Sequence, residues 1–153
     1  MISVRTRRID AARTALGQGD LSATHRFAAS LLSDNPLDAE GHFLLGIAES
    51  SAGRVTAGVR HLEQAVDLDP TGEYRAQLAK LYIMVRRDGD AAAILGQAEA
   101  APPADALSRD TMGCVYARLG DHAAALVHFE EAARLRPDDT EYRYNVAVTL
   151  NFL

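Results

Sequence analysis

Apolar and polar positions alternate at helical spacing along most of the chain. Residues 21–36, 55–70 and 122–137 carry small or apolar side chains three and four positions apart, with polar side chains between them. This spacing is typical of amphipathic helices. A proline ends each of these segments, and proline cannot continue a helix. The pattern therefore predicts a chain of helices joined by short turns.

Turn and stop signals recur at a nearly constant interval. A small-residue turn is expected at four places: Gly19-Asp20, Gly53-Arg54, Gly89-Asp90 and Gly120-Asp121. Helix-ending prolines follow at positions 36, 70 and 137, and the first two are 34 residues apart. Another amphipathic segment precedes each of the last three glycines, as in residues 39–53, 74–89 and 108–120. Two helices per interval of about 34 residues indicate a helical repeat protein.

Composition narrows the class of protein. The chain has 153 residues, of which 6% are aromatic and none is Trp, so the core has to be built from small side chains. The net charge of −5 and the single lysine, Lys80, argue against a nucleic-acid partner, which would need a surplus of basic residues. A lone Cys114 cannot form an internal disulfide. With no apolar run long enough for a secretory leader or a membrane span, we expect a cytoplasmic protein.

The repeats resemble the tetratricopeptide repeat family. The unit ending at Pro137 matches its pattern through Met112, Gly113, Tyr116, Gly120, Asp121, Ala125, Phe129 and Ala132. The unit ending at Pro70 matches through Leu45, Gly46, Gly53, Leu62 and Ala65, although Gly58 stands where the family usually has Ala. The first unit is similar through Ala12, Ala15, Gly19, Ala28 and Pro36, with Thr24 in the position of Gly58. The resemblance implies an all-α, right-handed superhelix of four helical hairpins plus one extra C-terminal helix.

We expect one array over residues 1–153. The repeats should span about 5–38, 39–72, 73–105 and 106–139, followed by an unpaired helix at 140–153. The third repeat is expected to be distorted, because Tyr82 lies farther from Gly89 than Tyr116 lies from Gly120. Its second helix should also end early, at Pro102-Pro103.

The family resemblance implies that the first helix of each repeat lines a concave groove. Helical spacing away from the packing positions selects the groove residues Ile9, Arg13, Glu40, Phe43, Ile47, Ser50, Tyr74, Gln77, Leu81, Leu107, Asp110, Cys114, Glu141, Tyr144, Asn145 and Val148. Such a surface suits a peptide or a partner protein, which makes the chain a non-catalytic interaction scaffold. For each of these residues, packing against a neighbouring repeat remains an equally open alternative.

One known use of the family is not expected here. The positions that would grip a C-terminal carboxylate with Lys and Asn hold Ile9, Arg13 and Leu44, and only Asn145 fits.

Candidate chemistry is weak throughout the chain. The five histidines are not expected to converge, since His61 and His128 occupy the same position in different repeats. No spacing suits a metal ion. Cys114 is expected to be a small buried side chain, and Gly17-Gln18-Gly19 a helix end rather than a phosphate loop. We therefore predict no enzyme activity, no metal and no cofactor.

The C-terminal segment is unusually apolar. Val146, Val148, Leu150, Phe152 and Leu153 would leave apolar surface in water. Three explanations are open: a fragment of a longer protein, a homodimer through this helix, or a helix that folds back on the array. The first is favoured, because arrays of this type usually close with a polar capping helix. Residues 110–153 also resemble arrays that precede a sulfotransferase-type domain in some bacterial proteins. The alternative function is then a binding or positioning module of a larger bacterial transferase.

Overall fold

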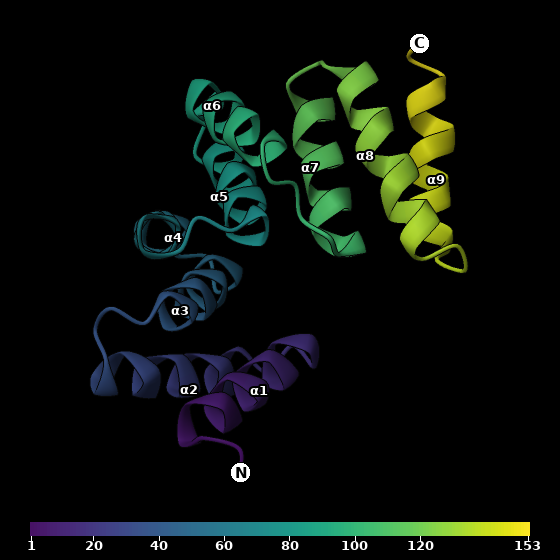
Figure 1. Cartoon of the computed structure of the whole chain (residues 1–153). Helices are drawn as coiled ribbons and strands as arrows, with labels where there is room; N and C mark the ends of the chain where they lie inside the picture. The colour runs from purple at the N-terminus through teal and green to yellow at the C-terminus, as the bar shows by residue number, and fades with distance from the viewer. The chain divides into compact units, whose positions relative to one another are not determined.

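The computed structural model describes all 153 residues and consists of nine α-helices without a β-strand. The helices are α1 (Val4–Gly17), α2 (Leu21–Asp34), α3 (Ala39–Ser51), α4 (Val55–Leu68), α5 (Gly72–Met84), α6 (Asp88–Glu99), α7 (Ala106–Arg118), α8 (His122–Leu135) and α9 (Thr140–Leu150). The first eight pair in sequence as four hairpins, and α9 packs on α8 (Figure 1). The predicted all-α fold is confirmed.

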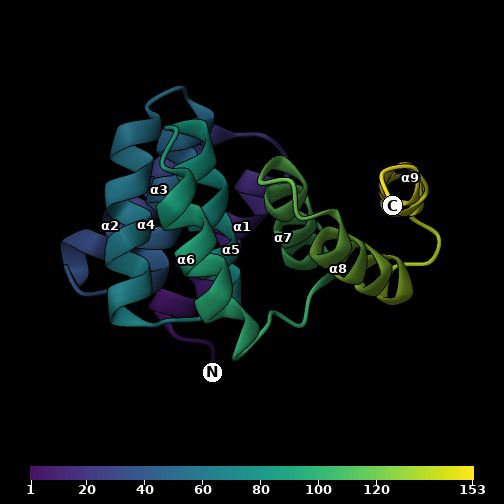
Figure 2. The same ribbon diagram turned by 90° about the horizontal axis from the view of Figure 1, so that it is seen from above.

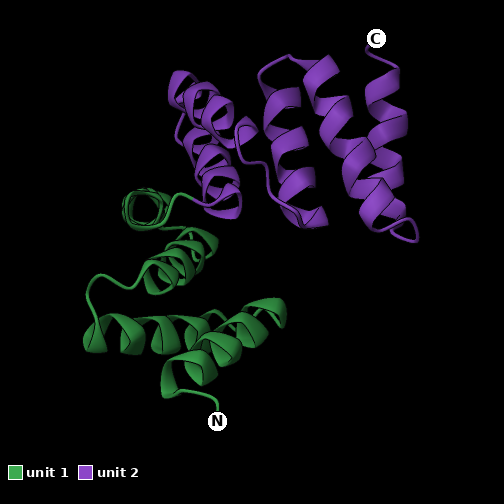
Figure 3. Ribbon diagram, in the orientation of Figure 1, with its two compact units in different colours: residues 1–70 green, residues 71–153 purple.

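The chain divides into two compact units (Figure 3). Unit 1 covers Met1–Pro70 and contains α1 to α4, whereas unit 2 covers Thr71–Leu153 and contains α5 to α9. Within unit 2, α7 packs against both α5 and α8 and lies between them in the view from above (Figure 2). A single continuous array over the whole chain stays a prediction.

All four hairpin turns use one backbone geometry. In each, one residue has a positive φ: Gly19 (75°), Gly53 (90°), Arg86 (62°) and Gly120 (86°). In the third hairpin the Arg86 N–H donates to the Ile83 carbonyl at 3.1 Å, and the next N–H, of Arg87, donates to the Tyr82 carbonyl at 2.8 Å. The other three turns repeat this pair of bonds, which satisfies carbonyls at the end of the first helix.

The prediction of a turn at Gly89-Asp90 is therefore wrong. Gly89 lies inside α6, and the turn falls at Arg86, four residues after Tyr82. The third hairpin thus keeps the spacing of the others, and only the residue type at the turn differs. Its second helix does end early, as predicted, because α6 has 12 residues where α2, α4 and α8 have 14.

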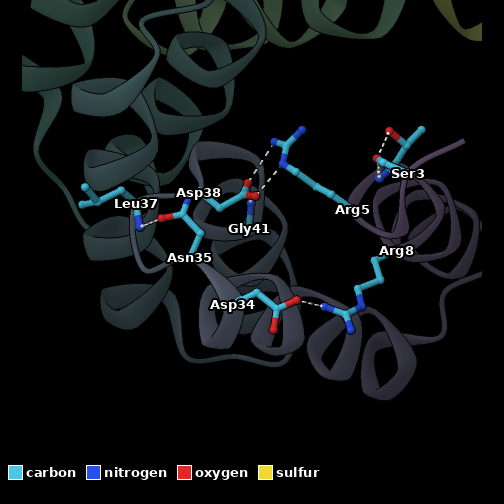
Figure 4. Close-up of polar contacts among 9 residues, drawn as sticks. Ser3, Arg5, Arg8, Asp34, Asn35, Leu37, Asp38 and Gly41 are labelled. Carbon is cyan, nitrogen blue, oxygen red and sulfur yellow. Dashed lines mark hydrogen bonds and ion pairs between the residues drawn. The ribbon is translucent and has the colours of Figure 1, made fainter.

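Two arginines of α1 bind the last residue of α2 and the connection that follows it (Figure 4). Arg5 donates from Nε to Asp38 Oδ2 at 2.6 Å, and Arg8 pairs with Asp34. Asp38 also caps α3, because its Oδ1 accepts the Gly41 N–H at 3.0 Å. Burial alone would raise the pKa of Asp38, but the Arg5 guanidinium and the backbone amides outweigh it and lower that pKa.

Small residues let the paired helices approach closely. A Cβ atom on Gly58 of α4 would lie 2.8 Å from the Gly46 carbonyl oxygen of α3. A Cβ atom on Gly113 of α7 would lie 2.6 Å from the Phe129 ring of α8. Glycine destabilises a helix by about 1 kcal/mol relative to alanine, so the close packing of the helices at these positions has to offset that cost.

Candidate functional site

Unit 2 contains a pocket of about 440 Å³ against the first helices of its repeats. Helix α7 contributes most of the lining residues, which we call the floor of the pocket, and α5 and the start of α9 contribute the rest. The lining residues are Lys80, Ile83, Met84, Leu107, Asp110, Thr111, Cys114, Val115, Arg118 and Glu141.

The spacing of the α7 residues explains why they share the floor. Leu107, Asp110, Cys114 and Arg118 are three or four positions apart, so they lie on one face of the helix. Helix α7 begins at the Asp105 cap, whose carboxylate accepts the Ser108 N–H at 2.8 Å. The cap and the 3.6-residue period together fix which side chains face the pocket.

The pocket combines an apolar surface with charged groups. Leu107 is 61% exposed and Met84 is 53% exposed, which are high fractions for apolar side chains of this size. Lys80, Arg118 and Glu141 line the same space, and none of these three side chains makes an ion pair. A surface with this mixture can contact both an apolar and a charged group of a bound molecule.

Asp110 is the most enclosed charged residue of the pocket, with an exposed fraction of 9%. Its Oδ1 accepts a hydrogen bond from Asn145 Nδ2 at 2.8 Å, while Oδ2 has only the Cys114 thiol at 3.9 Å. Burial raises the pKa of Asp110, and the carboxylates of Glu141 and Asp139 raise it further. No cation of the chain compensates this carboxylate directly.

Cys114 lies on an exposed part of the pocket floor, so the prediction of a buried side chain is wrong. Desolvation of the thiol, followed by the nearby Asp110 carboxylate, raises the pKa of Cys114 to about 11. The thiol is therefore protonated at neutral pH and is a poor nucleophile.

Only some of the predicted groove residues of unit 2 line the pocket. Leu107, Asp110, Cys114 and Glu141 line the pocket, and Asn145 reaches it through Asp110. Tyr144 is exposed and Val148 half-buried on α9. In α5, Tyr74 and Leu81 are buried and Gln77 is half-buried, while Lys80, Ile83 and Met84 face the pocket instead. The α5 selection is thus displaced by about one residue.

In unit 1, three of the six predicted groove residues contact one another. Arg13 of α1 donates from Nε to Glu40 Oε1 of α3 at 2.5 Å, and its guanidinium lies 5.5 Å from the centre of the Phe43 ring. Phe43 is 4% exposed and Glu40 is 8% exposed. Ile9, Ile47 and Ser50 are half-buried. Arg13, Glu40 and Phe43 therefore join α1 to α3, whereas Ser50 lies against Gly58 of α4.

The prediction that the histidines do not meet is wrong for one pair. His42 Nδ1 and His61 Nδ1 are 3.2 Å apart in unit 1. The His42 Nε2 atom donates to the Pro36 carbonyl at 2.8 Å, so its Nδ1 is left to accept from His61. Burial of His61, and then the neighbouring His42, lower the pKa of His61. No group of three or more His, Cys, Asp or Glu side chains is arranged to hold a metal ion.

A second histidine centre ties the end of α6 to the fourth hairpin. His128 is 2% exposed, and its Nε2 donates to Glu99 Oε1 at 2.6 Å. The Arg109 guanidinium can only donate, so His128 Nδ1 accepts from it at 3.3 Å. The Tyr116 hydroxyl also donates to Glu99 Oε1, at 2.8 Å. Arg109 also donates from Nε to the Pro103 carbonyl at 2.7 Å, so the network holds the segment after α6 in place.

The C-terminal residues predicted for self-association are mostly exposed. Leu150, Phe152 and Leu153 have exposed fractions between 52% and 66%, and Val146 is half-buried. Phe152 stacks on the His122 ring at the start of α8, with ring centres 4.5 Å apart. Self-association through these residues stays a prediction.

The chain is similar to known tetratricopeptide repeat proteins in both sequence pattern and fold. A family model described as "Tetratricopeptide repeat" matches residues 5–152. A tetratricopeptide repeat protein of Thermus thermophilus superposes with a TM-score of 0.76 at 21% identity, over 96% of this chain and 81% of that one. A MamA protein, strain AMB-1, gives a TM-score of 0.69 at 24% identity, over 99% and 88% of the two chains.

MamA from Desulfovibrio magneticus RS-1 gives a TM-score of 0.63 at 16% identity, over 99% of this chain and 92% of that one. These superpositions show a shared fold, and at such low sequence identities they show the fold alone. No curated protein sequence matches the chain. None of the nine helices is both long and apolar enough to cross a membrane. The link to a sulfotransferase domain stays a prediction.

Proposed function

Because the chain belongs to the tetratricopeptide repeat family, we propose that it is a non-catalytic scaffold that binds a segment of a partner protein. The pocket formed by α5, α7 and α9 of unit 2 is the observation that carries this proposal. Fold alone does not define a function, so the proposal depends on the chemistry of that pocket.

A protein segment fits this surface better than a reactive small molecule does. The exposed Leu107 and Met84 offer apolar area to a side chain, and the unpaired charges around them offer ion pairs to its neighbours. Segments bound in helical grooves are recognised through a few such anchors. The protonated Cys114 thiol supplies no nucleophile, and its neighbour Asp110 is engaged by Asn145. These features favour binding without covalent chemistry.

A matched pair of substitutions tests the proposal. Leu107 on the pocket floor and Val127 on α8 are both 61% exposed, so a lysine at either position should leave the core intact. The wild type and both variants would be used as baits in the native lysate, and the captured proteins compared by mass spectrometry.

We expect a protein that is retained by the wild type and by Val127→Lys but is lost with Leu107→Lys. A single-groove interaction with a Kd on the order of micromolar has a binding free energy of about 8 kcal/mol in magnitude. An interaction of that strength would still be captured at high bait density. If Leu107→Lys captures the same proteins in the same amounts as the wild type, the pocket is not the binding site and the proposal fails.

A further inference from the structure

We propose that the pocket of unit 2 receives a basic side chain, lysine or arginine, of the bound segment, with its cationic group against Asp110 and Glu141. This inference rests on the proposed function, because it names the chemistry of the segment that the pocket binds. It is carried by the charge distribution around Asp110.

The Asp110 carboxylate is buried without a cation. Its two hydrogen-bond partners, the Asn145 amide and the Cys114 thiol, are both neutral. The charged groups that act on it most strongly are the carboxylates of Glu141 and Asp139, which are negative as well. An enclosed carboxylate is destabilised until an opposite charge reaches it. A cation from a ligand would supply that charge.

The cations of the pocket itself are poorly placed for this role. Arg118 is eight residues from Asp110 on α7, which is about 12 Å along the helix axis. Lys80 belongs to α5, whereas Asp110 and Glu141 belong to α7 and α9, and the Lys80 side chain makes no ion pair. Its charge acts on the Cys114 thiol, where it lowers the pKa, but two carboxylates outweigh it there. The α7–α9 side of the pocket therefore remains acidic.

The apolar floor suits the stem of a long basic side chain. Leu107 precedes Asp110 by three residues, so the two lie side by side on the same face of α7. Lysine and arginine carry three or four methylene groups that cover apolar surface while the charged end stays polar. A basic side chain lying over Leu107 would place its charged end at Asp110, with Glu141 of α9 beside it.

A positional-scanning library of blocked hexapeptides tests the inference on the full 153-residue chain. Each pool fixes one amino acid at one position, and the pools retained by immobilised protein are quantified by mass spectrometry. The test variant is Asp110→Asn with Glu141→Gln, in which the new amide oxygen can still accept the Asn145 hydrogen bond. The control is Glu130→Gln, which removes one charge from an exposed position on α8 outside the pocket.

We expect pools with a fixed lysine or arginine to be retained best by the wild type and by Glu130→Gln. The double variant should bind these pools roughly tenfold more weakly, in keeping with the loss of one ion pair to the enclosed Asp110 and one to the exposed Glu141. Equal thermal melting of the proteins would verify that the fold is unchanged. Retention of acidic or uncharged pools instead, or a basic preference that the double variant keeps, overturns the inference and leaves the scaffold proposal standing. No retained pool at millimolar peptide would overturn both.

Discussion

Arg86 holds in the third hairpin the left-handed turn position that Gly53 holds in the second. The φ angles are 62° and 90°, and both turns make the same two backbone hydrogen bonds. A residue with a Cβ atom is destabilised by roughly 1–2 kcal/mol in this conformation, whereas glycine adopts it readily. The hairpin hydrogen bonds and the packing of α5 on α6 therefore maintain Arg86 in a strained conformation.

Replacing Arg86 with glycine should stabilise unit 2. We expect Arg86→Gly to raise the free energy of unfolding by about 1 kcal/mol, because the strain is removed and Arg86 is exposed. Urea denaturation followed by circular dichroism measures this change. The converse variant, Gly53→Ala, should destabilise unit 1 because its φ is 90°. A loss of stability in Arg86→Gly would show that the contacts of the arginine side chain stabilise unit 2 by more free energy than the backbone strain costs.

Gly89 gives an independent test of where the third turn lies. It sits in the first turn of α6, and a Cβ atom there would meet nothing within 4 Å. Gly89→Ala should therefore raise the free energy of unfolding by roughly 0.5–1 kcal/mol, through the better helix propensity of alanine. If Gly89 formed the turn with a positive φ, the same substitution would lower the melting temperature instead.

These turn residues also show how far the sequence could predict the fold. Periodic glycines located three of the four turns, and the family resemblance implied the number of helices. The third turn was missed because Arg86 carries no turn signal, and the nearby Gly89 offered a false one. In the same repeat, helical spacing selected Tyr74 and Leu81 for the groove face of α5, but both are buried and Lys80 and Ile83 line the pocket instead.

The hydrogen bonds between His128 and Glu99 and between Asn145 and Asp110 could not be predicted from the sequence. Spacing along the chain placed His128 in one repeat and Glu99 in another, but not in contact. Their contact depends on the path of the chain after α6 and on side-chain conformations that repeat spacing does not specify. The same holds for Asp110 and Asn145, which are 35 residues apart.

The approach of α3 and α4 predicts a specific intolerance to a methyl group. In Gly58→Ala the new Cβ would lie 2.8 Å from the Gly46 carbonyl oxygen and 2.9 Å from Ser50 Cβ. Because a backbone atom cannot move aside easily, we expect unit 1 to lose about 1–3 kcal/mol of stability by denaturant unfolding. The control is Gly17→Ala in α1, where a Cβ meets nothing within 4 Å and stability should not fall. Equal effects in the two variants would contradict the close helix contact.

The Glu99 network predicts a stability loss in acid. Burial would raise the pKa of Glu99, but the hydrogen bonds from Tyr116 and His128 outweigh it and lower that pKa below the ordinary 4.5. The folded state thus favours the carboxylate, which contributes its full stability above pH 4.5 and loses it as the pH falls through the folded-state pKa. Unit 2 should be destabilised in Glu99→Gln by about 1 kcal/mol at pH 7, allowing for the exposed side of the carboxylate.

Urea unfolding at pH 7 and pH 3 separates this effect from simple packing. The difference between wild type and Glu99→Gln should shrink as the pH falls from 7 to 3, because a growing fraction of the wild-type carboxylate becomes protonated. Glu63→Gln in unit 1 provides a matched substitution at a site outside this network. A difference that stays constant between the two pH values would mean that the charge of Glu99 does not stabilise the fold.

The binding role of the unit 2 pocket can be observed directly by nuclear magnetic resonance. The ¹⁵N-labelled chain would be titrated with the hexapeptide that the library selects, and the shifts of its backbone amides followed. This binding role predicts that the largest shifts fall at Lys80 to Met84, at Leu107 to Arg118 and at Glu141, and that they disappear in Asp110→Asn with Glu141→Gln. Saturable shifts confined to α6 and the outer face of α8, or shifts that the double variant retains, would contradict it.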